Sequence, residues 1–234
     1  MNILAICAHP DDLEVNCAGT LLKYYQQGHQ IFIATTTSGN TGSNQILSRT
    51  QLAATREAEQ LKSAAFMGAK VRFMRFDDEG LADTPASRRA VLTAIRWADP
   101  DIIFTNAQTD GSTDHAMTSS LVTRVILSVG GRHHNADLPP IQKKPKVFFF
   151  TAGGNIECNP RAYVDVSDVM EIKKKMLCCH ESQRAWMHEF KEEDFCDAMV
   201  GICRMMGTQA GYEYAEGFTA LDFPGYRGDY RLLP

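Results

Sequence analysis

The sequence predicts an α/β fold: a single-domain, Rossmann-like sheet that is doubly wound, mostly parallel and covered by helices on both faces. Apolar runs of strand length alternate with longer helical patterns through the first 150 residues. Helices of that length between strands imply right-handed crossovers, which join parallel strands. With 234 residues, 44% of them hydrophobic, the chain can bury one such core. We find no low-complexity linker and no internal repeat, so we expect one domain over residues 1–234.

The elements of the first 150 residues follow one another as this fold requires. The helical pattern is clearest at about 47–67, where Leu52, Ala58 and Leu61 recur at helical spacing. We expect the strands to lie in the order 3-2-1-4-5. The expected strands are 2–7, 30–36, 70–76, 101–105 and 147–150, and the other expected helices are about 14–27, 86–98 and 115–130.

Beyond residue 150 the pattern changes. A short strand is expected at 162–166, followed by a helix from about Ser167, a plausible N-cap, to Cys179. A second helix is expected at about 192–206. The tail, 212–234, is rich in Gly, Tyr and Phe and is expected to be irregular. This tail could cover its own sheet or a neighbouring subunit, so the sequence leaves a homo-oligomer open.

Composition excludes several classes of partner. The formal net charge of −4 gives no reason to expect nucleic acid. No apolar stretch approaches the roughly 20 residues that span a bilayer, so no membrane partner is expected. The N-terminus has no basic region before its apolar run, and the seven cysteines contain no Cys-x-x-Cys pair. We therefore expect a cytoplasmic protein without a signal peptide and with reduced thiols.

An acid-rich motif follows the first predicted strand directly. Residues 8–14 read Ala-His-Pro-Asp-Asp-Leu-Glu, so one imidazole and three carboxylates sit where a strand ends and a helix begins. Acids grouped this tightly face water or hold a cation, because an unpaired buried carboxylate is strongly unfavourable. A histidine beside them suggests a divalent metal with a spare carboxylate for proton transfer.

The expected topology brings a second histidine to this motif. In the order 3-2-1-4-5, strands one and four are neighbours, and ligands bind at the carboxyl ends of strands at that switch point. Strand four is followed by the segment 106–115, which ends in His115. His9, Asp12 and His115 should therefore meet, and two imidazoles with one carboxylate suit zinc.

Each residue of this site also has a plainer interpretation. His115 alone could be a surface residue at a helix start. The pair Asp11-Asp12 could be a magnesium site of the receiver-domain type, or acids favoured by a helix dipole. A dinucleotide site is disfavoured, because no Gly-x-Gly-x-x-Gly follows the first strand.

The motif and its surroundings resemble the PIG-L/LmbE family of zinc-dependent N-deacetylases. The first match is Ala8-His9-Pro10-Asp11-Asp12 followed by Glu14, and further matches extend over nearly the whole chain. They are Ala18-Gly19-Thr20-Leu21, Gly39-Asn40-Thr41-Gly42-Ser43, Arg56-Glu57-Ala58-Glu59, Asp78-Glu79-Gly80-Leu81, Asp114-His115, Tyr163-Val164-Asp165-Val166-Ser167, Cys179-His180-Glu181-Ser182-Gln183 and Tyr214-Ala215-Glu216-Gly217-Phe218.

The resemblance implies a role for each matched residue. His9, Asp12 and His115 would be zinc ligands and Asp11 the general base. Arg56 and Asp78 match positions that contact sugar hydroxyls in relatives acting on amino sugars. Their plainer interpretations are a helix-surface ion pair for Arg56 and a turn acid for Asp78.

The chain departs from the family at its second motif. Many relatives carry His-Pro-Asp-His, whose first histidine helps to stabilise the oxyanion, whereas residues 112–115 here read Ser-Thr-Asp-His. Losing one oxyanion donor can cost about 3–4 kcal/mol. His180 is the preferred replacement, with a helix C-terminal histidine as its plainer interpretation, and Ser112 could donate a neutral hydroxyl. Asp114 would orient a neighbouring group or cap the helix that starts near His115.

These observations predict a cytoplasmic, Zn²⁺-dependent hydrolase that removes an N-acyl group, expected to be acetyl, from an amino sugar or a glycosylated small molecule. One alternative is a metal-dependent amidase acting on a non-sugar amide. Another is a metal-binding signalling module of the receiver type, which the lack of a lysine after the last strand disfavours.

Overall fold

The computed structural model describes residues 1–151, 159–191, 194–224 and 226–234. Its seven strands form one sheet in the order β3-β2-β1-β4-β5-β7-β6. The strands are β1 (Asn2–Cys7), β2 (Gln30–Thr37), β3 (Lys70–Phe76), β4 (Ile102–Thr105), β5 (Lys146–Phe150), β6 (Ala162–Asp165) and β7 (Ala215–Ala220).

The sheet is mixed, and this corrects the predicted strand order. The first five strands are parallel and lie as 3-2-1-4-5. The sheet then continues through β7 and β6, which pair antiparallel, so the predicted order does not hold for the complete sheet. The tail expected to be irregular contains β7. Its sequence, AEGFTA, has few residues that favour strands. Gly217 is needed there because a Cβ atom would lie 2.7 Å from Thr151 Oγ1.

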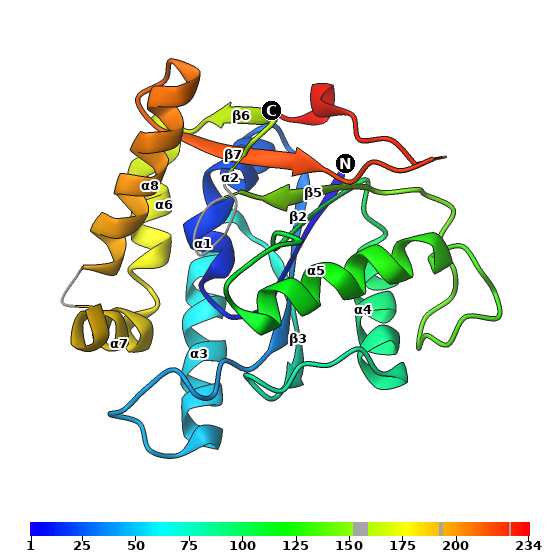
Figure 1. Ribbon diagram of the computed structural model, residues 1–234, viewed down its shortest axis with the longest axis horizontal. Coiled ribbons are helices and arrows are strands. Elements are labelled where there is room, and N and C mark those ends of the chain that lie inside the picture. Colours follow the sequence, from blue (N-terminus) through cyan, green and yellow to red (C-terminus); the bar gives the residue numbers. More distant parts are fainter. Residues whose placement is uncertain (152–158, 192–193, 225) are drawn as a thin grey trace.

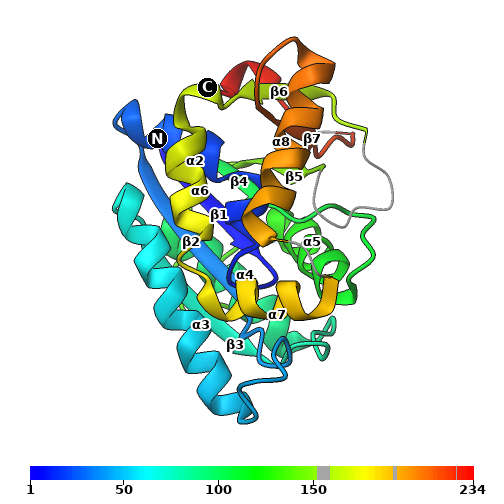
Figure 2. The ribbon, with the colours of Figure 1, turned by 90° about the vertical axis from the view of Figure 1, so that its left-hand side faces the viewer.

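Helices cover both faces of the sheet, as predicted (Figure 1). They are α1 (Asp12–Asn16), α2 (Ala18–Gln26), α3 (Arg49–Ala64), α4 (Pro85–Ala98), α5 (Thr113–Val125), α6 (Met170–Leu177), α7 (Glu181–Lys191) and α8 (Phe195–Ala210). Figure 2 shows α3 and α6 on one side of the sheet and α4 and α5 on the other. None of the helices in the described ranges is long and apolar enough to cross a membrane.

Alternation along β1 separates two cores. Ile3 and Ala5 are buried with residues of α1, α2 and α6, whereas Leu4 and Ile6 are buried with residues of α4 and α5. A central parallel strand is apolar on both sides because helices cover both faces. The end of β1 therefore lies between the two cores, where the acid-rich motif begins.

Several helix ends follow from local sequence. Thr84 and Ser87 form a capping box at α4, with Pro85 at the first helical position. Asp194 caps α8, which ends at Ala210 and is followed by Gly211 with a φ of 79°. The helix expected at 14–27 is split at Cys17, whose φ of −146° is not helical.

The helix α7 was not predicted. It is anchored through Ser182, whose N–H and hydroxyl both donate to the Glu59 carboxylate.

A buried ion pair ties the last part of the chain to α2. Lys173 Nζ lies 2.6 Å from Glu216 Oε1, and both side chains are fully buried. Glu216 also accepts the backbone N–H groups of Gly19 and Thr20. Cys17 provides no side-chain cap for α2, so the β7 carboxylate satisfies the first amides of this helix.

Candidate metal centre and active site

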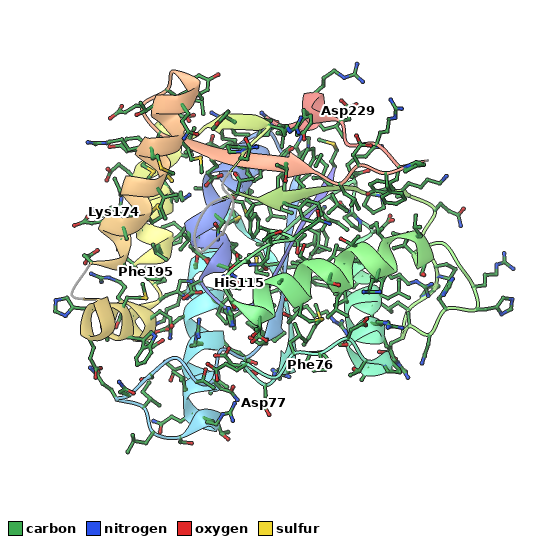
Figure 3. The ribbon with its side chains drawn as sticks, viewed as in Figure 1. Phe76, Asp77, His115, Lys174, Phe195 and Asp229 are labelled. Carbon is green, nitrogen blue, oxygen red and sulfur yellow. The ribbon has the colours of Figure 1, made fainter. Side chains whose placement is uncertain are left out.

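The two loops that carry the predicted ligands lie side by side. His9 and Asp12 follow β1, and His115 lies in the first turn of α5, which follows β4. Strands β1 and β4 are paired directly, as the expected order required. Figure 3 shows His115 at the end of α5 nearest to α1 and α3.

Three donor atoms converge at this point. His115 Nε2 lies 3.1 Å from His9 Nδ1 and 3.2 Å from Asp12 Oδ1. His9 Nδ1 lies 3.7 Å from Asp12 Oδ1. Zinc bonds of about 2.0–2.1 Å in tetrahedral geometry place neighbouring donors roughly 3.3 Å apart. The spacing and chemistry of these three side chains therefore fit one zinc-sized cation.

The second oxygen of Asp12 is fixed by hydrogen bonds. The backbone N–H of His9 donates to Asp12 Oδ2 at 3.0 Å, and Asn106 Nδ2 donates to the same oxygen at 3.2 Å. Asn106 Oδ1 in turn accepts the N–H of Ala8 at 3.0 Å. Sequence reasoning missed Asn106, whose only signal is its place directly after β4.

Outer carboxylates orient both imidazoles. His9 Nε2 lies 2.9 Å from Asp78 Oδ1 and 3.5 Å from Asp114 Oδ2, and His115 Nδ1 lies 3.2 Å from Asp110 Oδ2. Such partners fix the ring and raise its basicity as a ligand. Asp78, expected at a sugar hydroxyl, thus pairs with His9, and Asp110 was not predicted.

His9, Asp78 and Asp114 form a second group that could hold a cation. The carboxylates of this group already have other partners, however. Asp114 accepts the N–H groups of Glu79 and Leu81, and Asp78 accepts the hydroxyl of Thr41. The group of His9, Asp12 and His115 is therefore the better metal candidate.

Charge coupling is strong within the group of His9, Asp12 and His115. Burial opposes the charged forms, but the Asp12 and Asp110 carboxylates outweigh it and raise the pKa of His115 to about 10. Asp114, Asp12 and Asp78 likewise outweigh burial and raise the pKa of His9. The two histidines in turn hold the pKa of Asp12 well below its ordinary value, against the effect of burial. A bound divalent ion would replace the protons on the two imidazoles and supply the positive charge that they carry.

Asp11 lies beside the group without belonging to it. Its φ of 111° places it immediately before α1 in a left-handed conformation, which is rare for a residue other than glycine. Its Oδ2 lies 3.2 Å from Arg56 Nη2. Burial raises the pKa of Asp11 to about 6, although the Arg56 guanidinium acts in the opposite direction. A carboxylate with such a pKa can exchange protons near neutrality.

Arg56 faces protein groups rather than open solvent. Its side chain is buried and donates to the carbonyl oxygens of Gly39, at 2.8 Å, and Pro10, at 2.6 Å. Gly39 has a φ of 59°, and any Cβ there would collide with the guanidinium. Arg56 therefore supports the Asp11 loop, and it also lines the cavity, so its predicted contact with sugar hydroxyls stays a prediction.

The structure does not bring His180 to the open site. His180 is fully buried, and its Nε2 lies 3.4 Å from Glu14 Oε1. Glu14 also accepts hydrogen bonds from Gln60 and Ser63. His180 therefore sits behind α1, where it cannot contact an acyl oxygen in this conformation.

A cavity of about 680 Å³ opens over the site. Ser112 precedes α5 and makes no side-chain cap, so it offers a hydroxyl at the cavity wall. Cavities of this size accommodate a small ligand. The lining residues are His9, Asp11, Thr41, Gly42, Arg56, Asp78, Glu79, Gly111, Ser112, Thr113, Asp114, Gln183 and Trp186.

Comparison with known proteins gives a consistent result. The model of the family described as PIG-L, GlcNAc-PI de-N-acetylase, matches residues 4–126. Diacetylchitobiose deacetylase from Thermococcus kodakarensis is 29% identical over 225 residues, which cover 92% of this chain and 81% of that protein.

Solved structures share the fold. N,N'-diacetylchitobiose deacetylase from Pyrococcus horikoshii superposes with a TM-score of 0.80 at 24% identity, covering 94% of this chain and 83% of that one. GalB, the 4-carboxy-2-hydroxymuconate hydratase from Pseudomonas putida, gives 0.82 at 17% identity, covering 98% and 99%. Because the family model spans more than half of the sequence, the chain belongs to the PIG-L family of metal-dependent N-deacetylases.

Proposed function

We propose that this protein is a zinc-dependent hydrolase that removes the acetyl group from an N-acetylated amino sugar or glycoside. The convergence of His9, Asp12 and His115 beside a separate Asp11 is the observation that carries the proposal. The name of the Thermococcus relative, a diacetylchitobiose deacetylase, supports the choice of an amino-sugar substrate. His9, Asp12 and His115 would hold the ion and leave a position open for ligand exchange.

Zinc would supply a Lewis acid that polarises the acyl oxygen and acidifies the attacking water. Asp11 accepts the proton of that water as the oxygen attacks the acyl carbon. The same carboxylic acid then delivers the proton to the departing amine as the carbon–nitrogen bond breaks. The products are acetate and a free amine.

The surroundings of Asp11 fit this proton-transfer role. The Arg56 guanidinium 3.2 Å from Asp11 Oδ2 keeps one carboxylate oxygen engaged and limits rotation of the side chain. The N–H of Asp11 donates to Gln60 Oε1 at 3.3 Å, which also fixes the backbone. A base held in this way loses less entropy when it reaches the reactive geometry.

The cavity walls suit a polar, flat ligand. Thr41, Ser112 and Gln183 offer hydroxyl and amide groups, and Trp186 offers an aromatic surface. Ligand pockets commonly combine aromatic walls with a few polar groups that fix orientation. The hydroxyls of a sugar ring would contact the polar side chains, and its apolar face would contact the aromatic surface.

A second candidate is hydrolysis of a non-sugar amide. Ser112 stands where many relatives place an oxyanion-stabilising histidine, and His180 is too deeply buried to replace it. A neutral hydroxyl stabilises developing negative charge less than an imidazolium does. A non-sugar amide whose acyl group is more reactive than an ordinary acetamide would need less stabilisation of the oxyanion. The serine at position 112 therefore favours this second candidate.

Acetate release from a panel of N-acetylated sugars, glycosides and simple amides tests the proposal. We expect turnover of sugar acetamides, complete loss with a chelator, and recovery when one equivalent of zinc is restored. Turnover of simple amides alone would favour the second candidate. Activity that persists in the metal-free protein would contradict the proposed chemistry.

A further inference from the structure

Two cysteine thiols lie against each other where the helices α6 and α8 meet. Cys178 follows α6 directly, and Cys196 is the second residue of α8. Their Sγ atoms are 2.9 Å apart, and both are free thiols in this structure. The S–S bond of a disulfide is about 2.05 Å long, so the two sulfur atoms are already close to bonding distance.

Packed secondary structure holds this pair together from both sides. Cys196 is buried with Leu177 and Met199 in the small core that α6 and α8 share, and Cys178 packs against the same core. The N–H of Cys196 donates to Asp194 Oδ1 at 2.8 Å, which fixes its backbone at the start of α8. Figure 1 shows α8 beside α6, with α7 near the ends that carry the two thiols.

The surroundings of the pair suit oxidation. Arg184 of α7 and Lys174 of α6 both interact electrostatically with the two sulfur atoms. Positive charge beside a thiol favours the thiolate, which is the form that attacks an oxidant. Cys178 is half-buried, whereas Cys196 is buried, and this burial raises the pKa of Cys196 to about 12. Cys178 is therefore the thiol that meets an oxidant first.

We propose that Cys178 and Cys196 form a reversible disulfide when the protein is exposed to hydrogen peroxide. The Cys178 thiolate attacks one peroxide oxygen, the O–O bond breaks, and the sulfur becomes a sulfenic acid as hydroxide leaves. The Cys196 sulfur then attacks the Cys178 sulfur. The S–O bond breaks, and the leaving hydroxide takes the Cys196 proton to form water. A dithiol reverses the reaction and becomes a disulfide itself.

The bond joins the chain on the two sides of α7. This helix lies between the two cysteines in the sequence and places Gln183 and Trp186 in the cavity wall. A cross-link removes chain entropy from the open states of the loop that it closes, so the oxidised protein holds this wall more firmly. Neither cysteine lines the cavity, so the inference does not depend on the proposed function.

Peptide mapping of the oxidised wild-type protein tests the inference directly. The protein is treated with hydrogen peroxide, alkylated in denaturant and digested without reduction. We expect a cross-linked Cys178–Cys196 peptide, the loss of two of the chain's seven thiols, and recovery of both with dithiothreitol. The absence of a cross-link, a bond from Cys178 to another cysteine, or oxidation of Cys178 to a sulfinic acid would overturn the inference.

Cys178→Ser and Cys179→Ser form a matched pair of variants. Each removes one half-buried thiol from adjacent positions after α6, but only Cys178→Ser should abolish the cross-link. A cross-link that survives in Cys178→Ser would show that the pair is assigned wrongly. If this variant fails to fold, the wild-type peptide map still decides the inference.

Hydrogen exchange measures the effect of the bond on the cavity wall. On oxidation, amide exchange in α7 should slow at least about threefold in the wild type and in Cys179→Ser. Exchange should stay unchanged in Cys178→Ser under the same treatment. Equal exchange in the reduced and the cross-linked wild-type protein would overturn the claim that the bond fastens this wall.

Discussion

At the scale of single residues, the main feature of this protein is that two adjacent aspartates, Asp11 and Asp12, have different partners. Asp12 turns one oxygen toward His115 and the other toward the His9 N–H and Asn106. Asp11 points toward Arg56. The two side chains diverge next to a left-handed backbone conformation at Asp11, where φ is 111°.

Replacing Asp11 by Asn should therefore remove activity without removing the metal. The amide cannot accept a proton, so kcat should fall at least about 100-fold, while zinc remains near one equivalent per chain. Elemental analysis and acetate release measure the two properties on one sample. His115→Ala provides the comparison, because it should lose both zinc and activity. Loss of zinc in Asp11→Asn would show that Asp11 is itself a ligand.

Asn106 should act on metal affinity rather than on proton transfer. Asn106→Ala removes the hydrogen bond that holds Asp12 Oδ2 and leaves the Ala8 N–H without this partner. Loss of such an outer partner typically weakens metal binding about 10- to 100-fold. Competition with a zinc-binding dye measures the change, and added zinc should restore activity. An unchanged zinc affinity would show that the other contacts fix Asp12 without Asn106.

The sequence predicted which three residues would converge, but it did not predict the hydrogen-bond partners of the residues around them. His9, Asp12 and His115 could be placed together because paired strands β1 and β4 end at the same edge of the sheet. The setting of Arg56 and Asp78 depends on Gly39, Pro10, Thr41 and His9, which no periodic pattern connects to them. Asp110 and Asn106 lie in an irregular segment, where sequence spacing does not determine direction.

At the scale of elements, the chain after residue 150 closes the molecule around α1 and α2. The helix α6 contributes Lys173 and β7 contributes Glu216, and the two meet in the core against the start of α2. The helix α7 lies against α3 through the bonds of Ser182 to Glu59. It also places Gln183 and Trp186 at the cavity.

Breaking the buried pair should destabilise the fold much more than breaking an exposed one. Lys173→Met leaves Glu216 buried without its cation, which typically costs about 3–5 kcal/mol of unfolding free energy. Lys174→Met removes the exposed pair with Asp197 one position further along the same helix and should cost much less. Figure 3 shows Lys174 on the outer side of the molecule. Urea unfolding of both variants measures the difference. Equal losses would show that the buried pair contributes nothing specific.

Elements with strong periodicity were predicted well, and two without it were missed. The strand β3 and the helix α4 were placed within one residue of their observed bounds. The strand β7 has a weak strand composition and exists because β5 and β6 pair with it. Tertiary pairing of this kind overrides local propensity. The helix α7 follows α6 after only three residues, and a short break of this kind is hard to detect from spacing alone.

At the scale of the whole molecule, the sheet order places the active-site loops. The parallel strands β1 and β4 present their carboxyl ends at the centre of the sheet, and the antiparallel extension through β7 and β6 lies beyond β5. The predicted parallel part of the sheet was therefore sufficient to locate the site. A fold does not by itself determine a reaction, so the functional argument depends on the side chains at that edge.

Anomalous diffraction at the zinc edge from zinc-soaked crystals tests the central claim most directly. We predict one peak about 2.0–2.2 Å from His9 Nδ1, Asp12 Oδ1 and His115 Nε2, with the Asp11 carboxylate beyond bonding distance. A peak within bonding distance of His9 Nε2, Asp78 and Asp114 would contradict the account. A peak bonded to the Asp11 carboxylate would also contradict it.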